Sequence, residues 1–550
     1  MTNKKRLTRA LVLALVLAAV CAQAAAARRE RLVDAWRPVH YDVTLTLDNQ
    51  LTQLTSARTA LNVEVLKGPL AVVDLDFGEL TVDSVTVNGK PARFEHDNGR
   101  LNVFLAQPAK TGAKLSVVVS YHGKPKDGLI LKTDKAGKPS ATGDNWPDRV
   151  HHWIPVLDHP SAKATVNFTV TAPARDLVVA NGQFISTRDN TNATRTWTFK
   201  ESRPISPYCM IIAVGEYAQF EAPVKTPVPL AYYVPQTDRD SAVRGFSSAP
   251  QSIELFSERV APFPYEKLVL VVGATRFGGM ENAGAIVFSA GTFSNAVDAP
   301  PVSPNFKIRR GLVDVVGHEI AHQWFGDSVA IKTWADLWLS EGFASFFEAL
   351  VTERYDGHAA YLEHMRHDAD TYFNYARGRR APLYDTETED LFKLLNPNNY
   401  QKGAWVLHML RGLLGDEAFF KGIRAYYRAH EHGTASTEDL RAALEKASGK
   451  DLKEFFARWV YAAGHPRYEA SWSWSGGTLT IQLKQTQEDA PFLTPLEVEV
   501  VYASGAPERA KLTPTGRETV LHLPVSREPA DVRIDPDEWV LKELTVRRQG

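Results

Sequence analysis

The sequence predicts an α+β protein built from three successive segments. Apolar residues alternate with a period of two up to about residue 220, follow helical spacing from 221 to 466, and alternate again from 467 to 550. A chain of 550 residues is also too long for one compact core. We therefore expect an N-terminal antiparallel β domain (30–220), a central and mainly helical domain (221–466), and a C-terminal β-sandwich (467–550).

The first 24 residues have the layout of a secretory signal peptide. A basic start is followed by an apolar run and then by the small-residue pattern Ala22-Gln23-Ala24. The apolar run is about half the roughly 20 residues that cross a bilayer, so no membrane span is expected after removal of residues 1–24. Bulky Val20 argues against a lipid on Cys21. We expect export to the periplasm or the extracellular space.

Composition excludes some classes of partner. The formal net charge of −1 gives no global field that would attract nucleic acid. Removal of the signal peptide leaves a single cysteine, Cys209, so no intrachain disulfide is expected. Cys209 stands in the apolar run SPYCMIIAVGEY, which predicts a buried small side chain and not a nucleophile.

The two β segments show their strands directly. YDVTLTLD places Tyr41, Val43, Leu45 and Leu47 on one face, the pattern of a half-buried strand. Similar runs continue through the first segment, with turn signals such as Asn88-Gly89 between them. The last segment contains YEASWSW, TLTIQLKQT, LEVEVVYA, TVLHLPV and ADVRIDP, enough for a seven-strand sandwich.

The middle segment carries apolar residues at helical spacing. The stretches RRGLVDVVGHEIAHQWF, EGFASFFEALVTERY and EAFFKGIRAYYRAH all follow the 3.6-residue period. Thr437 before Glu438 and Asp439 is typical of a helix start, because acidic residues favour the positive end of the helix dipole.

Residues 317–344, GHEIAHQWFGDSVAIKTWADLWLSEGFA, predict a metal site. His318 and His322 are four apart, so their rings project from one helix face and can meet one Zn²⁺ at about 2.0–2.1 Å each. Glu319 is offset by about 100° around the helix. It therefore stands beside the metal, where a carboxylate can take a proton from a metal-bound water.

A third ligand is needed, because catalytic zinc has three protein ligands and an open position. Glu341 follows His322 after eighteen residues and opens a second helical stretch. Glu348 lies on the same helix face about 10 Å further along and is the weaker candidate. A lone HExxH arises by chance in helices, and the placement of Glu341 favours one Zn²⁺ per chain over a buried helix pair.

Three motifs together resemble the aminopeptidase-N-like zinc metallopeptidases, the gluzincin aminopeptidases of peptidase family M1. They are HEIAH with Glu341 inside WLSEGFA, GGMENAG upstream at 278–284, and NNYQKGAWVL downstream, where Tyr400 stands at the position of the family's catalytic tyrosine. FPYEKLVLVV and IPVLDHPSAKATVNF extend the likeness over most of the chain. The resemblance implies a thermolysin-like (zincin) catalytic domain.

The resemblance also implies a function, a zinc-dependent aminopeptidase acting on peptides with a free N-terminus. Glu319 and Tyr400 are then the expected catalytic residues, with Tyr400 hydrogen-bonded to the oxyanion. The expected substrate-binding residues are Gly278, Gly279, Met280, Glu281 and Asn282. Glu281 would bind the substrate's α-amine, and the two glycines would let a substrate backbone approach closely and pair as a strand. We expect a monomer or a weak oligomer.

The chain departs from the family pattern in places. Ser340 and Asp327 stand where the family usually has Asn, and Asp327 either orients a metal ligand or forms a solvated helix end. The family's second amine-binding Glu or Gln has no clear equivalent near Asn145-Trp146-Pro147, and Asp148 is the residue we take as the candidate.

The chain stops at Gly550, after the second β segment. The resemblance therefore implies a three-domain form that lacks the long C-terminal helical domain of many relatives, and a more open cleft. Two other functions stay open: a zinc hydrolase of another small substrate, such as an epoxide, and a non-catalytic scaffold on the same fold. Intact metal-ligand and catalytic positions disfavour the scaffold.

Overall fold

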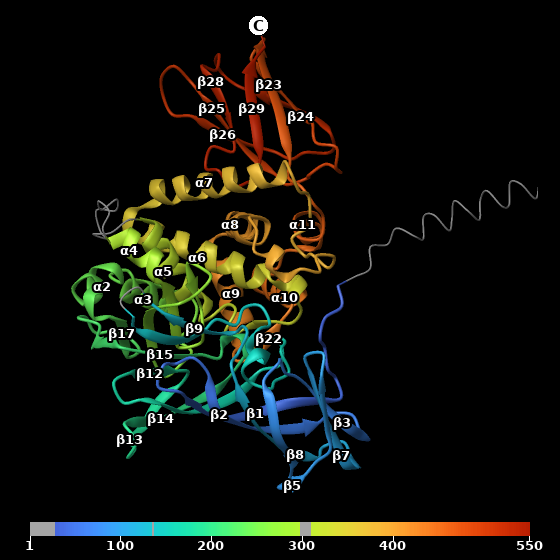
Figure 1. The fold of residues 1–550 in the computed structure, drawn as a ribbon. Helices are drawn as coiled ribbons and strands as arrows, with labels where there is room; N and C mark the ends of the chain where they lie inside the picture. Colours follow the sequence, from blue (N-terminus) through green and yellow to red (C-terminus); the bar gives the residue numbers. More distant parts are fainter. Residues whose placement is uncertain (1–27, 135–136, 298–309, 550) are drawn as a thin grey trace, which may run out of the picture.

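The computed structural model describes residues 28–134, 137–297 and 310–549. The predicted signal peptide, residues 1–24, lies outside the described residues. The first strands, the helical middle and the last strands are stacked, and helix α7 (His358–Ala376) crosses between the middle and the last strands (Figure 1). Within the described part of the chain, no helix combines the length and the apolar character needed to cross a bilayer.

Three sheets make up the N-terminal part. The largest has the order β13-β14-β11-β1-β2-β8-β4-β5. Its strands are β1 (Trp36–Leu47), β2 (Leu54–Val65), β4 (Thr81–Val87), β5 (Lys90–Pro91), β8 (Lys114–Gly123), β11 (Ala164–Pro173), β13 (Gln183–Asp189) and β14 (Thr194–Ile205). Beside it lie the sheets β3-β7-β6, from β3 (Leu70–Asp76), β6 (Phe94–Asp97) and β7 (Arg100–Ala109), and β12-β15-β10-β9, from β9 (Leu129–Thr133), β10 (Pro139–Gly143), β12 (Leu177–Ala180) and β15 (Ile212–Gly215).

The expectation of a wholly antiparallel N-terminal domain is wrong at one pairing. β1 pairs with β2 in the antiparallel sense but with β11 in the parallel sense, with Tyr41 opposite Val166. Parallel neighbours need a long crossover connection, and more than a hundred residues lie between these two strands. The predicted alternation of β1 is confirmed, because Tyr41, Val43, Leu45 and Leu47 are all buried.

The middle segment is less helical at its start than predicted. Five strands between residues 217 and 289 form a mixed sheet of order β16-β17-β18-β20-β19. Its strands are β16 (Tyr217–Glu221), β17 (Leu230–Pro235), β18 (Leu268–Gly273), β19 (Gly279–Met280) and β20 (Ala285–Ser289). β18, LVLVVG, is a continuous apolar run that pairs in parallel on both sides, and such strands lack the alternation that reveals a strand in sequence.

Helices form most of the rest of the middle segment. They are α2 (Arg239–Gly245), α3 (Ala249–Arg259), α4 (Ala290–Val297), α5 (Arg310–His322), α6 (Trp338–Asp356), α7, α8 (Gly403–Leu414), α9 (Asp416–His430), α10 (Thr437–Ser448) and α11 (Lys453–Trp459), with the short strands β21 (Ala330–Ile331) and β22 (Thr434–Ala435). α10 begins at Thr437 as predicted, capped by Ser436, whose backbone N–H donates to Asp439 Oδ2 at 2.8 Å.

Helices α6 and α8 cross at very close range. A Cβ placed on Gly342 of α6 would lie 2.8 Å from the Cα of Gly403, the first residue of α8. No side chain fits between the two backbones there. The crossing brings the π-helix Asn398–Lys402, which precedes α8, against α6.

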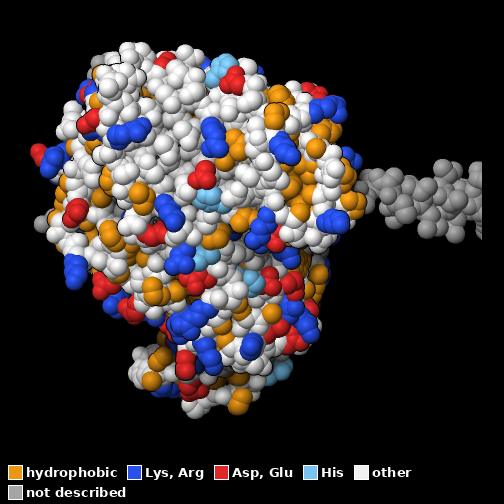
Figure 2. Space-filling model, turned by 90° about the horizontal axis from the view of Figure 1, so that it is seen from below, with side chains coloured by type: hydrophobic (Ala, Val, Ile, Leu, Met, Phe, Trp, Pro, Cys, Tyr) orange, Lys and Arg blue, Asp and Glu red, His pale blue; other side chains and the backbone are white. Residues whose placement is uncertain are grey.

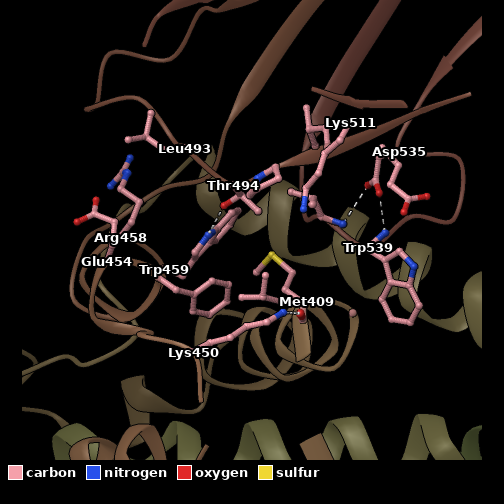
Figure 3. Close-up of a pocket in the computed structure, with 17 residues that line it drawn as sticks. Met409, Lys450, Glu454, Arg458, Trp459, Leu493, Thr494, Lys511, Asp535 and Trp539 are labelled. Carbon is pink, nitrogen blue, oxygen red and sulfur yellow. Dashed lines mark hydrogen bonds between the residues drawn. The ribbon is translucent and has the colours of Figure 1, made fainter. Parts of the chain in front are cut away.

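The C-terminal segment contains a four-stranded and a three-stranded sheet. One is β27-β24-β23-β29 and the other is β26-β25-β28. Their strands are β23 (Arg467–Ser475), β24 (Thr478–Gln485), β25 (Leu496–Val501), β26 (Glu508–Leu512), β27 (Glu518–Pro524), β28 (Asp531–Ile534) and β29 (Glu543–Arg548). The segment contacts α11 through Trp459, whose indole N–H donates to Thr494 Oγ1 at 2.9 Å (Figure 3).

The surface mixes both signs of charge. On the face shown in Figure 2, basic and acidic side chains are interspersed over the N-terminal strands. This distribution agrees with the formal net charge of −1 for the whole chain.

Candidate active site

Two helices bring the three predicted metal ligands together. His318 and His322 lie on α5, and Glu341 lies in the first turn of α6. Glu341 Oε2 is 3.3 Å from His318 Nε2 and 3.4 Å from His322 Nε2. A tetrahedral site with bonds of about 2.0–2.1 Å keeps neighbouring ligand atoms about 3.4 Å apart, so these three side chains could hold one metal ion without rearrangement.

The far nitrogens of both histidine rings are already bonded. His318 Nδ1 lies 2.9 Å from Glu348 Oε2, and His322 Nδ1 lies 3.1 Å from the carbonyl oxygen of Phe325. Both partners are acceptors, which places the ring proton on Nδ1 and leaves the Nε2 lone pair for a metal. The donor set therefore fits a divalent ion in its tautomers as well as in its distances.

Glu319 stands beside these ligands with a free oxygen. Its Oε2 is enclosed and makes no hydrogen bond with the described residues. Burial, with Glu281 nearby, raises the pKa of Glu319 to about 8, while the adjacent histidines act against that rise. For Glu341 the balance is the reverse, since His322 and His318 outweigh burial and lower the pKa to about 2.

The glycines of GGMENAG have a role that the sequence did not reveal. A Cβ on Gly279 would lie 2.4 Å from Glu319 Oε1, so only glycine lets strand β19 pass this close to the carboxylate. β19 pairs with β20 on one side and is the last strand of its sheet. Its other edge is open to a further strand, as we expect for a substrate backbone.

A cavity of about 410 Å³ joins these elements. Four of the five predicted substrate-binding residues, Gly278 to Glu281, line it together with the three ligands, Glu319 and Tyr400. Asn282 is fully buried and is not among the lining residues. Glu281 is only 6% exposed, and burial raises the pKa of its carboxyl.

Tyr400 lies on the π-helix that precedes α8. Its ring stacks on His318, with the ring centres 5.7 Å apart and the planes at 7°. Burial, and then Glu341, raise the pKa of the phenol well above its usual range, so the hydroxyl keeps its proton and is a donor. Single-turn π-helices are frequent at functional sites.

Two family models match the sequence. The peptidase M1 N-terminal domain matches residues 37–209, and the peptidase family M1 domain matches residues 245–459. The chain belongs to peptidase family M1. The C-terminal strands after residue 466 lie outside both matches.

Several curated relatives of this M1 chain are named as aminopeptidases. It is 28% identical over 407 residues to "Probable aminopeptidase 1" of Saccharolobus solfataricus, covering 72% of this chain and 50% of the relative. It is 32% identical over 331 residues to "Aminopeptidase N" of Streptomyces lividans, covering 56% of this chain and 36% of the relative. The chain spans about half the length of the first relatives that it matches.

The end of the cavity at Glu281, where we expect the substrate's amine and which we call the amine end, differs from the expectation for an M1 chain. Of the segment around Asn145-Trp146-Pro147, it is Trp146 that lines the cavity. Asp144 is fully buried and is held by Arg149 at 3.0 Å and by Thr275 Oγ1 at 2.9 Å. Asp148 lies outside the cavity, near Asp158. No second carboxylate or amide from this segment therefore faces Glu281.

Aromatic rings surround Trp146 instead. Its ring contacts those of Phe277 and Phe392 edge-on, at 6.0 and 5.7 Å between centres. Phe277 lines the same cavity, and Phe392 is 41% exposed. The cavity therefore combines an acidic floor with an aromatic wall.

Asp327 is neither a solvated helix end nor a direct partner of a ligand side chain. It is fully buried, and Cys209 Sγ donates to its Oδ1 at 3.1 Å. Gln323 Nε2 donates both to Asp327 Oδ2 at 2.9 Å and to the carbonyl oxygen of Glu281 at 2.7 Å. Cys209 is buried, as predicted from its apolar run.

Gln323 thus ties the metal helix to the GGMENAG segment. Its Oε1 also accepts the backbone N–H of Gly284 at 2.8 Å. Both hydrogen bonds to residues 281–284 are buried, where such bonds hold geometry firmly. Sequence reasoning missed this residue, although its position directly after His322, where α5 ends, was a usable signal.

Glu348 and Ser340 also have roles beyond the prediction. Glu348 is not a metal ligand but the partner of His318, and its Oε1 lies 3.4 Å from His364 Nε2. Ser340 Oγ is 3.1 Å from His322 Nδ1. The spacing of seven between Glu341 and Glu348 placed both on one face of α6, which was the available signal.

Proposed function

We propose that this chain is a zinc-dependent aminopeptidase that releases N-terminal residues from peptides. The observation that carries the proposal is one cavity that joins an open three-ligand set, a free carboxylate beside it, and a second acid at the end of an open strand edge. An endopeptidase does not need the second acid, and a scaffold needs none of these groups.

His318, His322 and Glu341 would hold the ion. Two imidazoles and one carboxylate suit zinc, and the protein leaves its fourth position open. When bound, zinc supplies a Lewis acid that polarises the scissile carbonyl and lowers the pKa of a bound water to about 7. Glu348 and the Phe325 carbonyl orient the two rings.

The chain's own side chains carry out the proton transfers. The free Oε2 of Glu319 is the acceptor for the proton of the attacking water, and it returns that proton to the leaving amine. The protonated phenol of Tyr400 donates a hydrogen bond to the oxygen on which negative charge develops. Both groups are held by packing before substrate binds, so little reorganisation is needed.

Substrate is positioned by the GGMENAG segment. The free edge of β19 pairs with the peptide backbone, and the Glu281 carboxylate binds the α-ammonium group. An acetylated N-terminus offers no charge to Glu281 and leaves that buried acid unpaired, which costs affinity.

The remaining features of the proposal rest on sequence patterns and strand order. They are a thermolysin-like catalytic domain at 221–466, a β-sandwich at 467–550 formed by the two C-terminal sheets, and export directed by residues 1–24.

The test uses a mixed set of short peptides, each with a free or an acetylated N-terminus. We expect release of the first residue from free peptides only, its loss after zinc removal by a chelator, and recovery with added Zn²⁺. Glu319→Gln should lower kcat by roughly 10³-fold or more while zinc content stays at one per chain. Cleavage of acetylated peptides at equal rates would contradict an aminopeptidase. Full activity of Glu319→Gln would contradict the assigned base.

A further inference from the structure

A second cavity lies at the junction of the catalytic segment and the C-terminal strands. It encloses about 340 Å³ between the end of α7 and residues 486–488, which follow β24. Its lining contains Arg377, Arg379, Arg380 and Arg467, and Glu488 is the one acid among them. No group assigned above belongs to this cavity.

Most of the charged groups around the cavity are already engaged. Arg467 pairs with Glu543 at 2.9 Å, and the same carboxylate binds His465 at 2.8 Å. Arg380 pairs with Asp489. Arg377 is exposed and makes no side-chain hydrogen bond or ion pair with the described residues. Arg379 lies 3.7 Å from Asp385. Arg377 is therefore the lining guanidinium without a counter-ion among the described residues, and Glu488 is an exposed acid at the same cavity.

Enclosed nitrogens beside the cavity also lack partners. Among the described residues, none bonds to Lys402 Nζ, His465 Nδ1, or the Nε and Nη2 of Arg458. Lys402 is fully buried, with Nζ 5.8 Å from the ring centre of Tyr372, and the His465 ring is 5.4 Å from the same ring. Both Tyr372 and His465 line the cavity. His465 Nε2 donates to Glu543, so Nδ1 is the acceptor nitrogen, and the unsatisfied donors are those of Lys402 and Arg458. Buried donors of this kind are rare unless something satisfies them.

The electrostatics of these groups agree with an excess of positive charge. Burial, and then Arg458, lower the pKa of Lys402 to about 7. Burial lowers the pKa of His465 to about 4, with Arg467 and Lys402 adding to the effect and Glu543 opposing it. His465 is therefore uncharged near neutral pH, while Lys402 is held near Arg458, so a bound anion would relieve a repulsion between these two side chains.

We propose that this junction cavity is a binding site for a small oxyanion, a phosphate or a free carboxylate, held by Arg377 and Arg380. Guanidinium groups bind both kinds of oxyanion through paired N–H donors. Tyr372 lines the cavity and its hydroxyl makes no hydrogen bond with the described residues, so it can serve as a further donor.

The site is separated from the candidate active site by the π-helix Asn398–Lys402. Asn398 lines the junction cavity and begins the π-helix that carries Tyr400. The proposal does not depend on the aminopeptidase assignment, because its readouts are anion binding and thermal stability.

The test titrates inorganic phosphate into the full-length, zinc-loaded protein at constant ionic strength, by calorimetry and by thermal unfolding. Arg377→Ala removes the unpaired guanidinium from the cavity. Lys511→Ala is the matched control, because Lys511 is an exposed cation without a side-chain partner among the described residues and it lines the neighbouring hollow shown in Figure 3.

We expect phosphate to raise Tm and to bind wild type and Lys511→Ala with the same Kd, and Arg377→Ala with a Kd roughly tenfold higher or more. Phosphate bound at the metal would act on all three proteins alike. The same response in all three proteins would overturn the proposal. So would a wild-type protein that binds neither phosphate nor N-acetylglycine.

N-acetylglycine and its amide separate the two sources of the oxyanion. Binding of the acid but not the amide, in competition with phosphate, identifies a free carboxylate as a ligand. Binding of phosphate alone identifies a phosphate site.

Lys402→Met tests the enclosed cation. Without phosphate, this variant should be more stable than wild type, because it removes a buried charge without a partner. Its Tm should also rise less on adding phosphate. A less stable variant with an unchanged response to phosphate would contradict the part assigned to the enclosed nitrogens.

Discussion

The metal end and the amine end of the same cavity are built in different ways. At the metal end, two adjacent helices supply all three ligands, and each histidine ring is held through its far nitrogen. At the amine end, Glu281 comes from the edge strand β19, while Trp146 comes from the N-terminal part of the chain. The metal end is therefore built from neighbouring segments with an extra hydrogen bond on each histidine. The amine end forms only where segments distant in the sequence pack together.

This difference indicates which substitutions should affect catalysis and which should affect the choice of substrate. Changes at the metal end should lower turnover or metal retention for every substrate. Changes at the amine end should alter the preference for a free N-terminus and leave turnover of bound substrate less affected.

Tyr400→Phe should have the largest effect among four tests of this contrast. Loss of one oxyanion donor typically lowers kcat by roughly 10²–10³-fold. We expect KM and zinc content to stay near wild-type values, as measured by steady-state kinetics and metal analysis. A rise in KM with unchanged kcat would instead place Tyr400 in substrate binding.

Glu348→Gln should weaken zinc binding by roughly 10–100-fold, since it removes the charged partner of His318. Competition with a chelator of known affinity measures this change, and excess Zn²⁺ should restore most activity. Glu363→Gln, on the exposed side of α7, is the control and should behave as wild type. Equal zinc affinity of Glu348→Gln and Glu363→Gln would contradict a role for Glu348 in metal binding.

Glu281→Gln should reduce the discrimination between free and acetylated peptides. A hydrogen bond to a charged group is worth about 1.5–3 kcal/mol, so kcat/KM for free peptides should fall roughly 10–100-fold. Any residual cleavage of acetylated peptides should be unchanged. A parallel loss for both peptide classes would show that Glu281 acts on turnover and not on selection.

Gln323→Met should have the smallest effect, a loss of up to roughly tenfold in kcat/KM. The substitution keeps a long side chain but removes the bonds to Glu281 and Gly284. Because Gln323 acts through Glu281, its effect should largely vanish in a Glu281→Gln background, as a double-mutant cycle would measure. Fully additive losses would separate the two residues.

The sequence was sufficient for the metal end because its spacing is local. His318, His322 and Glu341 sit on two helices whose periods are visible in the chain, and the fold places them at ligand distances. The alternating strand β1 was predictable for the same reason. A period of two or 3.6 residues determines which face a side chain occupies.

The amine end and the sheet pairing could not be predicted in that way. The parallel contact of β1 with β11 and the position of Trp146 beside Phe277 depend on which distant segments pack together. Asp327 looked like a charge near a helix end, yet the burial that decides its role comes from Cys209 and Gln323. Local sequence patterns do not predict which distant residues will pack together.

The contact between Gly342 and Gly403 makes the site vulnerable in a way that no list of reactive groups would reveal. Glu341 precedes one of these glycines directly, and Tyr400 lies three residues before the other. A single added methyl group would force two helices apart, and with them a metal ligand and the phenol that faces it. Replacement of either glycine by alanine is among the mildest changes in chemical terms. We nevertheless expect it to be among the most damaging to the structure of the site.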